Sequence, residues 1–198
     1  MTERRSRLQD DFMSVRRAGP AVVAPPRTSR ASLASLRKSI GSADFYTQVA
    51  KLDPKHASRW KTMIDVQRRF QQAEPGYRTD AARTYSESNR ETLHRVTIKL
   101  LERQKPGDNV YKQFVELHPA LFTENGAWKL AKDDQAAILL HTDPAMLFGK
   151  DNPLLLAEGL VTQPRWAALV KEAADETRAS RKSQGLPVTK QPKRSWLR

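Results

Sequence analysis

The sequence predicts an all-α protein, in which a basic helical hairpin packs on a module of several short helices between disordered basic arms. Apolar residues recur at three- and four-residue spacing over residues 53–104, as in amphipathic helices. Further along, several prolines are each followed by an apolar run, which favours short helices that begin at proline. No segment joins β-branched enrichment to sustained alternation, so no strand is expected. We therefore expect one helical domain over residues 44–176.

Residues 1–43 are predicted to form a disordered basic arm. They are rich in Arg, Ser and Pro, and no acidic residue occurs between Asp11 and Asp44. Residues 29–40 have the apolar spacing of a short helix within this arm. Such a composition is typical both of a basic linker and of a targeting or export leader, and it does not distinguish them.

The hairpin, residues 53–104, is predicted from two long amphipathic segments and the short Pro-Gly link between them. Asp53, which is followed by proline, is a favourable helix start, and an apolar stripe runs from Trp60 to about residue 72. The second helix begins near Thr79 and ends before Pro106. Helices joined by so short a link are expected to pair antiparallel, with Lys and Arg dense on their outer faces.

The module of short helices, residues 108–176, is predicted from polar residues that stand directly before proline. Proline disfavours helix in the residue before it and suits the first turn of a new helix. The breaks are His118-Pro119, Asp143-Pro144, Asn152-Pro153 and Gln163-Pro164.

The same module holds most of the large apolar residues that we expect to fill a core. It is also short of positive charge, as a buried scaffold should be. The predicted core residues are Phe114, Leu121, Trp128, Leu139, Leu147, Leu155, Trp166 and Leu169.

The formal net charge of +13 is distributed unevenly along the chain. Residues 1–43 carry +6 and residues 44–106 carry +5, whereas residues 107–176 carry −5. Residues 177–198 carry +7 and are expected to be a basic tail. An acidic, apolar module thus lies between basic flanks, which points to an anionic partner.

No motif for catalysis, a metal or a cofactor is found, so an enzyme is not expected. Cysteine is absent, and no Gly-rich phosphate loop or nucleophile motif occurs. The histidines, His56, His94, His118 and His141, are spaced too widely for a zinc pair and are expected at the surface or its boundary. No apolar run is long enough for a transmembrane segment.

The function favoured by the charge is non-enzymatic binding of nucleic acid, DNA or RNA, with low specificity. Arg forms bidentate contacts with phosphate and supplies most of the positive charge here. Such a protein would be cytoplasmic or associated with the nucleoid. The expected contacts are Arg59, Arg68, Arg69, Arg83, Arg90, Arg95, Lys99, Lys190, Lys193 and Arg194.

The alternative is a protein that acts by protein–protein interaction on an acidic protein surface. It would be a secreted bacterial effector that enters a host cell, or a phage or plasmid accessory protein, with residues 1–43 as its export or targeting leader. A basic surface that is simply solvated explains the charge equally well.

Overall fold

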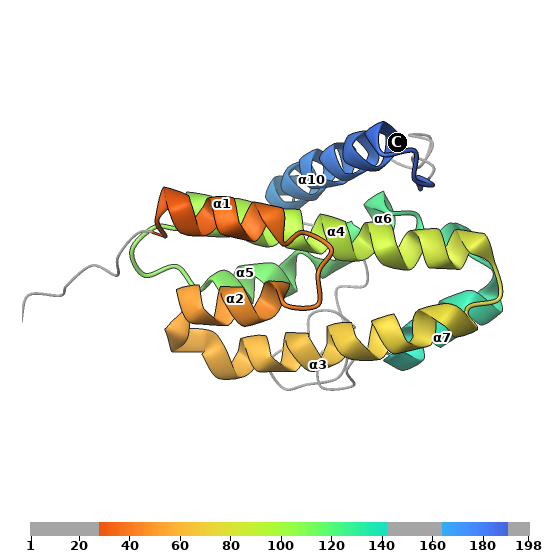
Figure 1. Cartoon of the computed structure of the whole chain (residues 1–198), viewed down its shortest axis with the longest axis horizontal. Coiled ribbons are helices and arrows are strands. Elements are labelled where there is room, and N and C mark those ends of the chain that lie inside the picture. Colours follow the sequence, from red (N-terminus) through yellow and green to blue (C-terminus); the bar gives the residue numbers. More distant parts are fainter. Residues whose placement is uncertain (1–27, 142–163, 190–198) are drawn as a thin grey trace, which may run out of the picture.

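The computed structural model describes residues 28–141 and 164–189, which form helices joined by turns (Figure 1). Within these ranges there is no strand, so the all-α prediction is confirmed. The α-helices are α1 (Arg30–Lys38), α2 (Phe45–Leu52), α3 (Ala57–Ala73), α4 (Asp80–Arg103), α5 (Val110–Glu116), α6 (His118–Glu124), α7 (Lys132–His141) and α10 (Pro164–Ser183), and short 3₁₀ turns cover Pro54–His56, Glu74–Gly76 and Ala127–Lys129.

The folded body begins with α1, earlier than the expected boundary at residue 44. The Ser29 side chain caps this helix by accepting a hydrogen bond from Ser32 N at 3.1 Å. Leu33 and Leu36 are buried against the core, and Leu36 is only 1% exposed. Residues 30–43 therefore belong to the body, because two leucines on one face of α1 pack against it. Residues 1–27, for which a disordered basic arm is predicted, lie outside the described residues.

Helices α3 and α4 run antiparallel, as the hairpin prediction requires, but they do not pack directly along their lengths (Figure 1). Helix α3 packs on α2 and α7, whereas α4 packs on α10 and α5. Rings from α2 fill part of the space between the two, because the Tyr46 ring centroid lies 5.9 Å from that of Trp60 on α3 and 5.1 Å from that of His94 on α4. The hairpin is therefore open, with a layer of aromatic rings between helices α3 and α4.

The core is shared by the whole body and is not confined to residues 108–176. Of the predicted core residues, Phe114, Leu121, Trp166 and Leu169 are buried, which confirms those four. The side chains of the other predicted core residues lie outside the part of the chain that is described. Residues that precede the module complete the same cluster, namely Leu33, Leu36, Phe45, Val49, Trp60, Met63, Val66 and Val96. Helices as short as α5 cannot bury their apolar faces alone, so they pack on α4.

Two of the predicted proline breaks are confirmed. Helix α6 begins at His118, directly before Pro119, and α10 begins at Pro164. The other two proline pairs fall outside the described residues. No helix in the described ranges combines the length and the apolar character that crossing a bilayer requires.

Helix α10 continues past residue 176 to Ser183, so the expected basic tail begins within a helix. Thr177 and Arg181 are buried where α10 packs on α4. Gly185, with a φ of 69°, then ends the helix in a left-handed conformation that glycine adopts without strain.

Candidate nucleic-acid interface

Three junctions of the chain meet at one end of the molecule, on the left in Figure 1. They are the start of α1, the turn between α2 and α3, and the loop from α4 to α5. Each junction contributes exposed cationic side chains. We call this surface the basic end, and it comprises Arg30, Lys51, Lys55, Arg59, Arg103, Lys105 and Lys112.

The side chains of the basic end reach into solvent. The Arg103 and Lys112 side chains are 61% and 71% exposed. Arg59 lies with its guanidinium carbon 5.7 Å from the ring centroid of Tyr111, a cation–π contact. Tyr111 is buried and Arg59 is exposed, so the contact positions the Arg59 charge at the surface.

Carboxylates at this end are engaged by the chain itself. Asp53 is only 7% exposed and accepts hydrogen bonds from Trp60 Nε1 at 2.9 Å and from His56 Nδ1 at 3.0 Å. Asp108 accepts from the backbone N–H of Lys105 at 2.8 Å, which closes the loop after α4. Asp53 is thus committed to the interior, while the lysines on either side of it in sequence remain in water.

Some cations of the basic end also have carboxylate neighbours, but these pairs are weak. Arg103 lies 3.2 Å from Glu172, and Lys112 lies 3.9 Å from Glu116. Pairs between exposed groups contribute roughly 0–1 kcal/mol, so a phosphate can replace the carboxylate at little cost.

Of the arginines predicted on α3, Arg59 belongs to the basic end. Arg68 is exposed on the outer face of the helix and lies 3.3 Å from Asp65. Arg69 is half-buried. The outer face of α3 therefore extends the positive surface away from the basic end.

The basic residues predicted on α4 are largely engaged by neighbouring groups. Arg83 pairs with Asp80 and donates to Tyr77 O at 2.6 Å. Arg90, which is 17% exposed, pairs with Glu74 at 2.5 Å. Arg95 is half-buried. These side chains hold the fold together more than they present charge to a partner.

Lys99 is the most strongly engaged of the predicted residues. Its Nζ donates to Glu172 and to Glu176 of α10, each at 2.8 Å, and the residue is 9% exposed. Burial disfavours its charge, but the two carboxylates outweigh burial and raise the pKa of Lys99. The two ion pairs of Lys99 with Glu172 and Glu176 link α10 to α4. Lys190, Lys193 and Arg194 lie outside the described residues.

Most of the basic end was missed from the sequence. Lys55 follows Pro54, and Lys105 precedes Pro106, so proline marks two of the three junctions. That signal places the lysines in turns, but it does not say that the turns face the same way. Their convergence depends on the direction of α2 and α5, which only the tertiary structure gives.

Among the side chains whose burial the structure describes, no aromatic ring is exposed for a base to stack on. His94 differs from the expected surface or boundary position, because it is fully buried and stacks on Phe45 with ring centroids 3.8 Å apart, whereas His118 is half-buried, as expected. Gly41 N donates to His94 Nδ1 at 2.9 Å, which places the proton on Nε2 for a contact with Gln67 Oε1 at 3.1 Å. In the described part of the chain, His, Asp and Glu side chains do not gather as a metal site would require.

The arrangement offers a cluster of exposed cations beside an aromatic core. Such a surface suits an extended polyanion more than a small molecule. Comparison of the chain with protein-family models, with curated proteins and with solved structures gives no match.

Proposed function

We propose that this protein binds nucleic acid without catalysis, by contacts between the basic end and the phosphate backbone. One observation carries the proposal: cations from three junctions face solvent at one end, while Asp53, which stands between Lys51 and Lys55 in sequence, is buried and hydrogen-bonded. Binding would release counterions from the nucleic acid, so affinity would fall steeply as salt rises.

The surface favours a duplex backbone over single strands. Proteins that hold single strands stack bases on exposed aromatic side chains, and the described surface offers none. Base-specific reading needs polar side chains on an element that enters a groove, whereas the basic end consists of helix ends and turns. We therefore expect low sequence specificity, and DNA and RNA duplexes are compared directly in the test.

The sequence before Thr28 is also basic, and it is joined to the described chain at the basic end. Thr28 directly precedes α1, whose start belongs to the basic end. Residues 1–27 contain several arginines, including Arg16 and Arg17, and few acidic residues. They would lengthen the contact with the backbone.

The test is a charge reversal with a matched control. A variant with Lys51→Glu, Lys55→Glu and Lys105→Glu is compared with one carrying Lys38→Glu, Lys132→Glu and Lys182→Glu, since all six lysines are exposed and both variants change net charge equally. Fluorescence anisotropy gives the Kd for duplex DNA, duplex RNA and single strands between about 50 and 200 mM salt.

The basic-end variant should bind at least tenfold more weakly and show a salt slope smaller by roughly 2–3. The control variant should stay near wild type. Equal weakening in both variants would show that the basic end has no special part, and wild-type protein that fails to bind at low salt would overturn the proposal altogether.

A role in protein–protein interaction remains the competing proposal, and a pull-down separates the two. Retention of protein from nuclease-treated lysate, with no dependence on nucleic acid, would favour it. Any export leader would then have to end before Arg30, because α1 packs into the core.

A further inference from the structure

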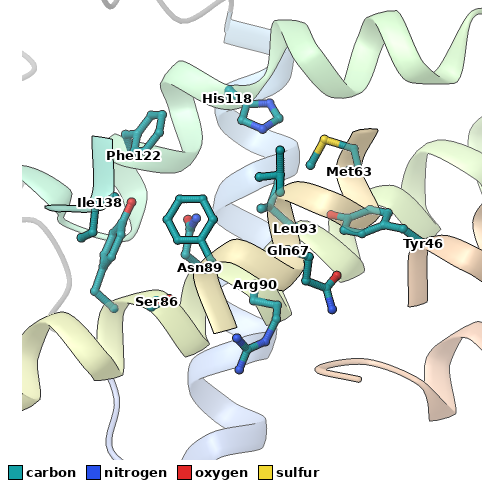
Figure 2. Close-up of a pocket in the computed structure, with 13 residues that line it drawn as sticks. Tyr46, Met63, Gln67, Ser86, Asn89, Arg90, Leu93, His118, Phe122 and Ile138 are labelled. Atoms are coloured by element: carbon teal, nitrogen blue, oxygen red, sulfur yellow. The ribbon is translucent and has the colours of Figure 1, made fainter. Parts of the chain in front are cut away.

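A cavity lies in the opening between α3 and α4, where the two helices are held apart. Figure 2 shows Met63, Leu93, Phe122 and Ile138 around it, so its wall is mainly apolar. Its volume is about 70 Å³. One ordered water needs roughly 10–15 Å³ of such space, so the cavity accommodates about five to seven water-sized atoms.

The cavity wall includes a buried hydroxyl without a partner. Tyr85 is 1% exposed and lines the cavity. Its hydroxyl makes no hydrogen bond to any described residue. Burial raises the pKa of Tyr85, so the group stays a neutral hydroxyl that can donate or accept. A buried polar group of this kind calls for a ligand or water as its partner.

A hydrogen-bond acceptor stands in the same wall. His118 faces the cavity in Figure 2, and its Nδ1 donates to Phe114 O at 2.8 Å. Burial lowers the pKa of His118, so the ring is neutral and Nε2 is left as an acceptor.

The charged and amide groups at the cavity each have at least one partner within the protein. Arg90 is neutralised by Glu74 at 2.5 Å. Gln67 donates to Ser42 O at 2.8 Å and contacts His94 through its Oε1. Arg90 is thus compensated by Glu74, so no net charge is left at the described wall for an ionic ligand. The wall groups without a hydrogen-bond partner among the described residues are the hydroxyls of Tyr46 and Tyr85 and the Nε of Arg90, beside the imidazole of His118.

We propose that this cavity binds a small, uncharged, largely apolar molecule with one hydroxyl group, of about the size of phenol. The hydroxyl of the ligand pairs with Tyr85, His118 Nε2 is the second acceptor within the site, and the ring packs against Met63, Leu93 and Phe122. The site is separate from the basic end, so this proposal stands or falls independently of nucleic-acid binding.

The experiment titrates phenol and benzene into the full chain and measures both dissociation constants by ligand-observed NMR. Wild type should bind phenol more tightly than benzene. Tyr85→Phe should weaken phenol binding roughly three- to tenfold and leave benzene binding unchanged, because only the hydroxyl partner is lost. Tyr77→Phe is the matched control, since Tyr77 is also buried but does not line the cavity.

A second variant tests the same cavity in case Tyr85→Phe does not fold. Leu93→Phe places extra atoms in the cavity and should abolish binding of both probes. Absence of phenol binding to wild type at millimolar concentration, or equal losses in Tyr85→Phe and Tyr77→Phe, would overturn the proposal.

Discussion

Arg181 of α10 and Glu91 of α4 lie 2.6 Å apart, although the Arg181 side chain is only 2% exposed. The second guanidinium nitrogen lies 2.6 Å from Glu87, and Nε donates to Pro187 O at 2.7 Å. An arginine from the expected basic tail is thus the polar anchor between the last helix and the central one. It also fixes the chain beyond Gly185 to the body.

Replacing Arg181 with Met should destabilise the protein by about 2–3 kcal/mol. The change leaves Glu91, which is 17% exposed, without its counter-charge, whereas Glu87 is 42% exposed and regains water. Lys182→Met is the control, because Lys182 is exposed on the next position of α10. Urea unfolding measures both variants, and equal effects would show that the Arg181 contacts contribute nothing special.

Stability should fall between pH 7 and pH 5 because the buried His94 and the half-buried His118 are neutral in the folded state. Burial, with Arg90 nearby, holds the pKa of His94 well below its ordinary value, and burial also lowers the pKa of His118. Below about pH 6.5 the unfolded chain binds protons that the folded chain does not. Unfolding therefore becomes easier as pH falls, by up to about 1.4 kcal/mol per pH unit for each histidine.

The measurement is the free energy of urea unfolding at several pH values, with His118→Gln for comparison. Gln keeps a side-chain donor but does not titrate, so the pH dependence should shrink by roughly half. Glu172 and Asp175, whose ion pairs lower their pKa values, affect stability only at more acidic pH. A free energy that stays constant from pH 7 to pH 5 would contradict this account.

The limits of α4 could be predicted from sequence because its signals are local. Thr79 caps the helix by accepting from Ala82 N at 3.1 Å, and the helix ends at Arg103, shortly before Pro106. The environment of its side chains could not be predicted, because the partners are distant in sequence. Lys99 has the spacing of a surface lysine, yet it pairs with Glu172 and becomes buried.

His94 illustrates the same limit within the core. It lies on one helical stripe with Thr97 and Leu101, both buried, and that spacing was the available sign of burial. Nothing local indicates that Gly41 would donate to its Nδ1. The basic end has a similar origin: the sequence places lysines at turns, but only the packing of α2 and α5 brings the turns together.

Truncation should separate the folded body from the chain before it. Removal of residues 1–27 leaves α1 in place, so the free energy of unfolding should change by less than about 0.5 kcal/mol. Removal of residues 1–43 uncovers the sites of Leu33 and Leu36 and should cost about 3–5 kcal/mol, from two buried leucines. Circular dichroism with urea tests both, and a fully stable 44–198 fragment would contradict the role of α1.

The carboxylate of Asp134 in α7 stabilises the start of α4 by hydrogen bonds. It accepts from Arg78 N at 3.2 Å and from the Thr79 hydroxyl at 2.7 Å, and Asp134 is 1% exposed. The negative charge also faces the N-terminus of a long helix, where it is favourable. Asp134 thus supports the Thr79 cap from a helix more than fifty residues away in sequence.

Asp134→Ala should therefore cost about 1–3 kcal/mol, since it removes a buried acceptor and leaves the Thr79 O–H and the Arg78 N–H without the carboxylate to which they donate. Asp133→Ala is the matched control, because Asp133 is the preceding residue, is 68% exposed and pairs with the exposed side chain of Arg78. That change should cost less than about 0.5 kcal/mol. Hydrogen exchange should show faster opening of the first turn of α4 in Asp134→Ala alone. Similar exchange in the two variants would mean that the Thr79 cap holds without the Asp134 carboxylate.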